Sequence, residues 1–324
     1  MKDLSNALEV VSTADAASPT AARTAEVDAE HAGQRIDNYL LRVCKGVPRS
    51  HIYRIVRSGE VRVNSRRIDA TYRVEAGDRI RIPPIRLAAR ETPAKAARPA
   101  EFPVVFEDSA LVVIDKPAGV AVHGGSGVSF GVIESLRAAR PEAKFLELVH
   151  RLDRETSGLL MVAKKRSALT GLHAQLRDGG AHKRYLALAA GEWKGAERRV
   201  ELPLRKYVTK EGERRVSVDR AEGRESRTDF RLEQSFQGYA LLSAILHTGR
   251  THQIRVHLAH LGFPIAGDDK YGDFELNKQL AKKGLKRMFL HATEMRVRHP
   301  ISGETLELEA PLPAELRSFL KTLK

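Results

Sequence analysis

The stretch HRLDRETSGLLMVAKK, residues 150–165, joins a cluster of charged side chains directly to an apolar run. The run from Gly158 to Ala163 is continuous and of strand length, so we predict a central β-strand that is buried on both faces. The preceding HRLDRETS segment must then be a loop that carries polar groups to the edge of a sheet. A rigid buried strand would fix the position of the Asp153 carboxylate in that loop.

The chain around this strand predicts a large α+β unit over residues 102–324. Its opening segment, VVFEDSALVVIDKPAGVAVH, has two apolar strands on either side of Asp108-Ser109 and then turns at KPAG. Residues 167–180 have leucines at helical spacing and end at Gly-Gly. Most later segments have strand patterns, without regular alternation of strands and helices. This favours a largely antiparallel sheet over a Rossmann-type fold.

Residues 31–85 predict a smaller unit of two helices followed by short strands. RIDNYLLRVCKG has helical spacing, and RSHIYRIVRSGE reads as a second helix with Ser50 as N-cap and Gly59 as its stop. The remainder alternates apolar and polar residues across turns at 64–65 and 76–78. Arginines flank these elements with few acids among them, which favours a nucleic-acid contact over a merely solvated face. The candidates are Arg49, Arg54, Arg57, Arg62 and Arg66.

The remaining segments are predicted to be a tail and a linker. Residues 1–30 are rich in Ala, Ser and Thr without a sustained apolar period, so we expect a disordered tail. Residues 86–101, RLAARETPAKAARPAE, combine proline, alanine and alternating charge, which is typical of a linker. The length of 324 residues is compatible with two folded units.

The charge of the chain indicates a polyanionic partner. There are 55 Lys and Arg against 41 Asp and Glu, for a net charge of +14, and the sequence pI is about 9.9. Residues 1–30 carry two basic and six acidic side chains, whereas residues 31–92 carry fourteen basic and six acidic. The densest positive charge therefore falls in the small unit.

Location and redox chemistry follow from what the composition lacks. No apolar run approaches the ~18 residues of a membrane span, and the first 30 residues lack the order of a signal peptide, so we expect a cytoplasmic protein. The single cysteine, Cys44, excludes an internal disulfide and a cysteine-rich zinc site. Its helical, apolar surroundings predict a small core residue.

A second informative stretch is HTGRTHQIRVHLAHLG, residues 247–262. Thr251 has the character of an N-cap, and the apolar spacing after it predicts a helix. Arg255 would then lie near the N-terminal end of that helix, where a cation is disfavoured by up to about 1 kcal/mol and needs an anionic partner. The candidate partner is Asp153, in a bidentate pair that would keep the carboxylate ionised and oriented.

The histidines of this stretch, His252, His257 and His260, invite a metal-site interpretation. Their spacing matches none of the zinc-enzyme signatures, and no cysteine or placed carboxylate completes a ligand set, so we predict no metal. Hydrogen bonding and phosphate contact are the roles expected of them.

Two candidate residues keep a purely structural alternative. Asp153 could cap a turn or pair with Arg151 rather than act in catalysis. Tyr185 begins a strand pattern in HKRYLALAAGEW, residues 182–193, and a tyrosine there most often packs in a core with a hydrated hydroxyl. A nearby aromatic substrate would be needed to give Tyr185 a functional role, so the residues alone leave both alternatives open.

Four motifs together resemble one family of enzymes. HRLDRETSG, KRYLAL, TGRTHQIRVH and the earlier DKPAGVAVH follow in the order found in pseudouridine synthases of the RluA family, across residues 102–312. Residues 34–85 resemble the S4 RNA-binding domain. With that front end, and with GDDKYGD and LKRMFLHA further along, the chain most resembles the type that acts on 23S ribosomal RNA.

This resemblance implies an isomerase that detaches uracil from C1′, rotates it and rejoins it through C5, without a metal or organic cofactor. It implies that Asp153 is the catalytic carboxylate, that Tyr185 stacks on the target base, and that Arg255 is the partner of the aspartate. Arg151 resembles the residue that helps open the RNA and hold the flipped nucleotide. The neighbouring polar side chains are further candidate RNA contacts: His150, His252 and Arg250.

The chemistry agrees with this assignment. Cleavage of an N-glycosidic bond creates positive character at C1′, which an adjacent carboxylate can stabilise or trap. The residues leave open whether Asp153 attacks C1′, attacks C6 or assists proton removal from C2′. The expected partner is 23S ribosomal RNA or a large-subunit assembly particle, with no membrane, and a monomer would suffice.

Three competing interpretations remain. The chain could be an RNA-binding assembly factor that keeps an inactive synthase-like fold. It could be a base-releasing glycosidase, in which water intercepts the intermediate. It could also be a synthase of the same family that acts on other ribosomal or transfer RNA uridines.

Overall fold

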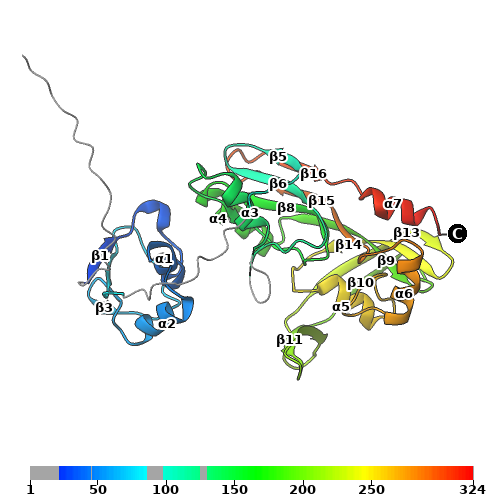
Figure 1. Ribbon diagram of the computed structural model, residues 1–324, viewed down its shortest axis with the longest axis horizontal. Helices are drawn as coiled ribbons and strands as arrows, with labels where there is room; N and C mark the ends of the chain where they lie inside the picture. Colours follow the sequence, from blue (N-terminus) through cyan, green and yellow to red (C-terminus); the bar gives the residue numbers. More distant parts are fainter. Residues whose placement is uncertain (1–21, 45, 86–97, 125–129, 324) are drawn as a thin grey trace, which may run out of the picture. The chain divides into compact units, whose positions relative to one another are not determined.

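The computed structural model describes residues 22–44, 46–85, 98–124 and 130–323 (Figure 1). Contacts within the chain divide it into two compact units, and the division falls between residues 94 and 95. Each unit has an apolar core of its own, formed in the first by residues from Val27 to Ile85 and in the second by residues from Ala110 onwards. The two units are described separately.

The first unit packs two helices against a small sheet. Helix α1 spans Ile36–Val43 and α2 spans Arg49–Arg57, and both bury their apolar residues in the core, as the sequence predicted. The turn at Asn64-Ser65 has positive φ at both residues, which a two-residue hairpin requires. A short 3-10 helix, η1, spans Ala29–His31. The strands lie in the order β1 (Arg23–Glu26), β4 (Arg79–Ile82), β2 (Arg62–Val63) and β3 (Arg66–Arg67).

The two ends of α2 compare differently with the prediction. Gly59 follows the helix in the left-handed region, at φ +78°, and confirms the predicted stop. The predicted N-cap at Ser50 is wrong, because the helix begins at Arg49 and Ser50 lies in its first turn. Pro48 occupies the cap position without a side-chain hydrogen bond. Its ring fixes φ near −60°, so the chain enters the helix without the hydroxyl cap that we sought in the sequence.

Strand β1 corrects the expected tail. The sequence predicted disorder through residue 30, yet β1 pairs antiparallel with β4, and Val27 next to it is buried. Three of the four β1 residues are exposed, so backbone hydrogen bonds hold this strand rather than side-chain burial. A segment held in this way has no apolar period to detect. Residues 1–21 of the predicted tail and residues 86–97 of the predicted linker lie outside the described residues.

The second unit is built on one large sheet. Its strands lie in the order β10-β13-β14-β9-β15-β8-β6-β5, with β16 beside β15 and β7 beside β8. Within the described part of this sheet, the neighbours are antiparallel except β15 and β8, which confirms the predicted α+β class. The bounds are β5 Val104–Glu107, β6 Leu111–Lys116, β7 Glu147–Leu148, β8 Ser157–Ala163, β9 His182–Ala190, β10 Glu197–Glu201, β13 Arg227–Phe236, β14 Tyr239–Leu246, β15 Leu290–Arg298 and β16 Thr305–Glu309.

Helices cover both faces of this sheet (Figure 1). Apolar residues of α3 and α5 belong to one core cluster, and those of α4 belong to the cluster on the opposite face. A separate hairpin of β11 (Leu204–Val208) and β12 (Arg214–Val218) extends from the sheet. The helices are α3 Val132–Ala139, α4 Arg166–Arg177, α5 Gln253–His260, α6 Phe274–Lys282 and α7 Ala314–Leu320.

Among the helices of the described residues, none is both long enough and apolar enough to cross a membrane. The longest described helix, α4, has twelve residues, whereas a membrane span needs roughly 20.

Strand β8 confirms the prediction made from its apolar run. All seven of its residues are buried, and successive side chains enter the core clusters on the two faces of the sheet. Gly158 has φ +109°, and a Cβ there would lie 2.2 Å from the carbonyl oxygen of Ala292 on β15. A glycine is therefore required where β8 and β15 meet. The loop that carries Asp153 joins the sheet at this contact.

Candidate active site

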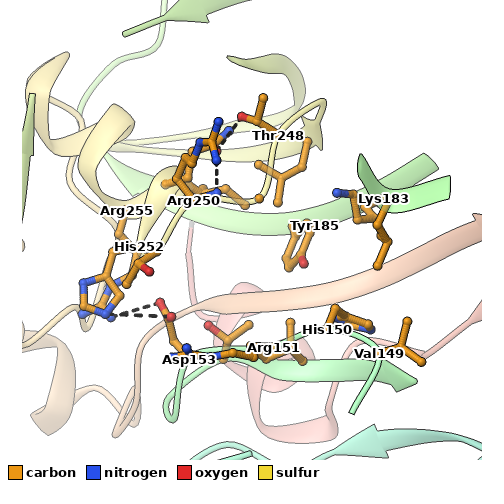
Figure 2. A pocket seen from close by; sticks show the side chains of 18 of the residues that line it. Val149, His150, Arg151, Asp153, Lys183, Tyr185, Thr248, Arg250, His252 and Arg255 are labelled. Atoms are coloured by element: carbon orange, nitrogen blue, oxygen red, sulfur yellow. Dashed lines mark hydrogen bonds and ion pairs between the residues drawn. The ribbon is translucent and has the colours of Figure 1, made fainter. Parts of the chain in front are cut away.

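A cleft of about 870 Å³ opens beside the start of β8. The loop from Leu148 to Asp153, the C-terminal end of α4, the start of β9 and the segment from Leu246 to Arg255 all line it. Figure 2 shows Tyr185 between the loop that carries Asp153 and the segment that carries Arg250. Sequence-distant elements thus bring the three predicted catalytic residues, Asp153, Tyr185 and Arg255, to one cleft.

Arg255 connects two carboxylates. Its Nη1 donates a hydrogen bond to Oδ2 of Asp153 at 3.3 Å, so the predicted contact is present. The predicted bidentate geometry is wrong for that pair, because Arg255 makes its bidentate contact with Asp268, from Nε to Oδ2 at 2.8 Å and from Nη2 to Oδ1 at 2.6 Å. The side chain of Asp268 is fully buried, whereas that of Asp153 keeps 24% of its exposure. Asp268 holds the guanidinium, and the guanidinium positions the accessible carboxylate.

Burial and pairing oppose each other in this cluster. Burial alone lowers the pKa of Arg255, but the hydrogen bonds and charge of Asp268, and then of Asp153, outweigh it and raise that pKa above its ordinary value. Burial alone would raise the pKa of Asp268, yet its contacts with Arg255 lower it. Both groups are therefore ionised at neutral pH, and the buried ion pair is complete before Asp153 is added.

His252 is a neutral neighbour of Asp153. Its Nδ1 lies 2.7 Å from the hydroxyl of Tyr271, and that hydroxyl accepts a hydrogen bond from the N–H of Val216. The other ring nitrogen, Nε2, lies 3.8 Å from Oδ1 of Asp153. Burial lowers the pKa of His252, which agrees with the neutral form.

The start of α5 differs from the predicted cap. The helix begins at Gln253, and its N-cap is His252 in the left-handed conformation, φ +54°, rather than Thr251. Gln253 is buried, and its Oε1 accepts hydrogen bonds from the Thr248 hydroxyl and the Arg250 N–H. Its Nε2 donates to β13, so this one amide holds the preceding turn in place of a hydroxyl cap.

Tyr185 packs in the core and also lines the cleft. It lies on β9, is 6% exposed and belongs to the main core cluster, yet it also lines the cleft. Burial, and then the charge of Asp153, raise the pKa of Tyr185 above its ordinary value. The phenol is thus neutral, and part of its ring is available to a planar ligand next to Asp153.

A buried lysine fixes the loop that carries Asp153. Lys116 is fully buried, and its Nζ donates to the carbonyl oxygens of Pro117 and Val120 at 2.8 Å and of Arg154 at 3.1 Å. Gly119 and Arg154 exchange two further hydrogen bonds of 2.9 Å. Burial, followed by the charge of Arg287, lowers the pKa of Lys116 to about 8. The KPAG turn and the catalytic loop are therefore one connected structure.

His150, a predicted RNA contact, makes a structural contact with β8. Its Nε2 accepts a hydrogen bond from the N–H of Met161 on β8 at 3.1 Å. Burial, and then the charge of Lys183, lower the pKa of His150 to about 4, so it is neutral and offers no positive charge to RNA. Arg151 and Arg250, by contrast, are exposed at the cleft. Arg250 donates from Nε to the carbonyl of Glu225 at 3.0 Å.

The predicted arginines of the first unit are all exposed. Among the residues that the structure describes, none of the five has a carboxylate partner. Arg49 donates to the side-chain oxygen of Asn38 at 3.3 Å, and Arg54 lies against His51. Their charge is available to a polyanion. These five arginines belong to the first unit, whereas the cleft lies in the second unit: Arg49, Arg54, Arg57, Arg62 and Arg66.

Sequence reasoning missed several residues that build the site. Asp268 lies 13 residues after Arg255, and a search for a second acid that could balance a buried arginine would have pointed to the Asp-Asp pair at 268–269. Gln253 and Tyr271 stand in the motifs TGRTHQIRVH and GDDKYGD, but no role was predicted for them, because their importance comes from buried contacts. The described residues hold no group of three His, Cys, Asp or Glu side chains that could bind a metal ion.

Comparisons with known proteins agree with this arrangement. Residues 110–260 match the family model described as RNA pseudouridylate synthase, and residues 34–80 match the S4 domain. Ribosomal large subunit pseudouridine synthase C of Yersinia pestis is 54% identical over 303 residues, which cover 92% of this chain and 94% of that protein. The chain belongs to the RNA pseudouridine synthase family.

Other members of the family support the same conclusion. Ribosomal large subunit pseudouridine synthase C of Escherichia coli (strain K12) is 53% identical over 306 residues, covering 92% of this chain and 95% of that protein. Among solved structures, human RNA Pseudouridylate Synthase Domain Containing 4 matches with a TM-score of 0.57 and 25% identity, over 68% of this chain and 94% of that chain. This pseudouridine synthase is thus an enzyme that isomerises uridine in RNA, and it carries an S4 domain in front of its catalytic fold.

Proposed function

We propose that this synthase converts specific uridines of 23S ribosomal RNA to pseudouridine, with Asp153 as its catalytic carboxylate. The observation that carries the proposal is the contact of 3.3 Å between Arg255 and Asp153, at a cleft that Tyr185 also lines. The substrate class rests on relatives more than half identical that are named for the ribosomal large subunit.

The proposed roles follow the geometry of the cleft. Asp153 is the accessible carboxylate, so it reacts with the sugar or the base, while Arg255 and the buried Asp268 keep it oriented. Tyr185 offers a neutral ring on which the target base stacks, and exposed Arg151 holds the RNA around the extruded nucleotide. Attack at C1′, attack at C6 and proton removal from C2′ all remain compatible with this placement.

The organisation of the chain belongs to the same proposal. We assign RNA affinity to the first unit, whose exposed arginines lack carboxylate partners among the described residues, and the chemistry to the unit that follows the segment 86–101. The proposed substrate is the ribosomal RNA or a large-subunit assembly particle. The proposed active form is a cytoplasmic monomer, because one chain supplies all of the cleft residues described above.

Tritium release tests this function directly. Ribosomal RNA transcripts labelled at uridine C5 must lose that hydrogen when the new C5 bond forms. We expect release by the wild type, and a loss of at least about 10³-fold in Asp153→Asn, because the reacting carboxylate is gone. RNA affinity should stay within a few-fold. Asp269→Asn is the matched control, since Asp269 lies 3.5 Å from the same guanidinium but is 78% exposed.

Each other outcome would indicate a different function for this protein. Free uracil in place of tritium release would indicate a base-releasing glycosidase. RNA binding without release from free or particle-bound large-subunit RNA would indicate an assembly factor. Release from other ribosomal or transfer RNAs alone would keep the enzyme and change its substrate, and full activity of Asp153→Asn would remove Asp153 from the mechanism.

A further inference from the structure

Lys183 is a cleft residue to which the roles described above give no part. It lies on β9 two residues before Tyr185, so the two side chains project from the same face of the strand. Both line the cleft, and Figure 2 shows the Lys183 side chain beyond Tyr185 as seen from Asp153. Lys183 is only 7% exposed, so its side chain lies in the wall of the cleft and not on the outer surface.

The ammonium group of Lys183 has no partner among the residues that the structure describes. Across the described ranges it makes neither a hydrogen bond nor an ion pair, and burial is the one influence on its pKa, which is lowered. His150 next to it is neutral and makes no compensating contact. A cation with so little solvent contact and no counter-charge among the described residues is costly, and the fold keeps one in the wall of the cleft, where its Nζ can still be reached. Lys116, the other buried lysine, shows the contrast, because three carbonyl oxygens surround it.

We propose that Lys183 is a further catalytic residue, whose ammonium group contacts the target uracil and stabilises the negative charge that forms on that base during the reaction. This inference rests on the proposed function. A uracil that stacks on Tyr185 would present its edge to a side chain two residues away on the same strand face, because such neighbours lie about 7 Å apart.

The negative charge arises in each chemical route that is still open. If the C1′–N1 bond breaks, its electron pair stays on the uracil and is shared among N1, O2 and O4, while either C1′ bonds to Asp153 or Asp153 takes the C2′ proton and a C1′=C2′ double bond forms. If Asp153 adds to C6, the electron pair of the C5–C6 bond moves toward O4. An ammonium at the oxygen edge of the base lowers the energy of all three states, and a preorganised donor in a dry site is effective there.

The depth of Lys183 favours the base over the RNA backbone as its ligand. His173 and Arg177 on α4 line the same end of the cleft and are exposed, where phosphates of neighbouring nucleotides can reach them. Lys183, by contrast, is only 7% exposed. A phosphodiester, which carries its charge on the outside of the RNA, would have to enter the cleft to meet it, whereas a flipped base enters the cleft in any case.

The test separates RNA binding from chemistry. Transcripts that release tritium with the wild type are used to measure the dissociation constant and the single-turnover rate at saturating enzyme, for wild type, Lys183→Met and Lys183→Arg. We expect Lys183→Met to lower the rate by about 10²–10³-fold, as the loss of one oxyanion donor does, with the dissociation constant changed less than about threefold. Lys183→Arg should recover part of the rate. Lys194→Met, an exposed residue elsewhere, controls for the change in net charge.

A second substrate distinguishes charge stabilisation from a structural role. Fluorine at C5 stabilises a uracil anion, so transcripts made with 5-fluorouridine need less help from Lys183. The consumption of 5-fluorouridine, followed by nuclease digestion and mass spectrometry, should show a deficit in Lys183→Met that is at least about fivefold smaller than with uridine.

Other results would overturn the inference. A normal rate at saturation, with weaker binding and a shallower salt dependence, would make Lys183 a phosphate contact. Equal deficits on both substrates would make it structural, and no deficit would give it no role. Failure of the wild type itself to release tritium would count against the proposed function, which is a separate result.

Discussion

The two units of this synthase place their arginines in opposite surroundings. In the first unit Arg62 and Arg66 are exposed, and among the residues that the structure describes no carboxylate pairs with them. In the second unit Arg255 is buried between Asp268 and Asp153. Exposed arginines offer charge to any polyanion, with a strength that depends on salt. The buried arginine has its charge already neutralised, so it contributes position rather than affinity.

Asp268 gives the largest expected effect within this comparison. Asp268→Ala removes the bidentate partner of the buried Arg255 guanidinium and leaves it only the single contact with Asp153 and a 3.5 Å contact with the exposed Asp269. We expect the free energy of unfolding of the second unit to fall by about 3–5 kcal/mol, as it does when one partner of a buried pair is removed. Urea denaturation of the full chain, followed by a probe in the second unit, measures this. Tritium release should also fall, because Asp153 loses its orientation.

Asp153→Asn supplies the matched control for stability. Its side chain keeps 24% of its exposure and has one 3.3 Å contact with Arg255, so we expect a stability change within about 1 kcal/mol. The double variant Asp268→Leu with Arg255→Met should recover stability without activity, because no buried charge is left unpaired. Equal losses of unfolding free energy in Asp268→Ala and Asp153→Asn would contradict the inference that Asp268 holds Arg255 in place while Asp153 reacts.

His150 predicts a pH dependence that the exposed groups of the first unit do not supply. Its pKa is lowered to about 4 in the folded state, against an ordinary value of 6.5, so the unfolded chain binds more protons between these values. Stability therefore falls as pH drops from 6.5 to 4, by about 2–3 kcal/mol at the lower end. His150→Gln keeps an acceptor for the Met161 N–H and should show a shallower slope. Parallel curves for the two proteins would refute this origin.

The exposed arginines predict the smallest effect, and one of a different kind. Arg62→Gln and Arg66→Gln should each weaken binding to ribosomal RNA roughly three- to tenfold, and reduce the slope of log affinity against log salt by about 0.7–0.9. The single-turnover rate at saturating enzyme should not change. Arg231→Gln is the control, because Arg231 is exposed in the second unit and pairs with Glu197 at 3.0 Å. An unchanged salt slope would remove these arginines from the RNA interface.

Local patterns predicted a large part of this fold. The apolar run of β8 could be read directly, since a strand buried on both faces needs no alternation. Both helices of the first unit and the stop at Gly59 followed from spacing and from one glycine. Strand β1 could not be read, because its contribution lies in its backbone and in the partner that it meets. Sequence patterns therefore predict the elements that are specified by side-chain burial, and miss those that are specified by backbone pairing.

The sequence predicted the parts of the site that the chemistry of a single residue indicates, and not those that depend on contacts in the fold. Asp153 and Arg255 were paired correctly, since one buried-helix arginine needs an acid, but the sequence does not show that a second carboxylate takes the bidentate position. The sequence places His150 beside Asp153 but does not show that burial keeps the imidazole neutral. Lys183 begins the KRYLAL motif, yet no role was predicted for it, because an ammonium group without a counter-charge in a cleft wall is a property of the folded chain.

The close contact between Gly158 and Ala292 limits how far Asp153 can lie from the sheet. Four residues separate Asp153 from Gly158, so the carboxylate is tethered to the sheet by a chain of at most roughly 17 Å, part of which is taken up by the turn from Asp153 to Thr156. Gly158 cannot slide along β15, because its missing side chain fits one place. The spacing between aspartate and glycine is thus itself a component of the active site, as specific as the identity of either residue.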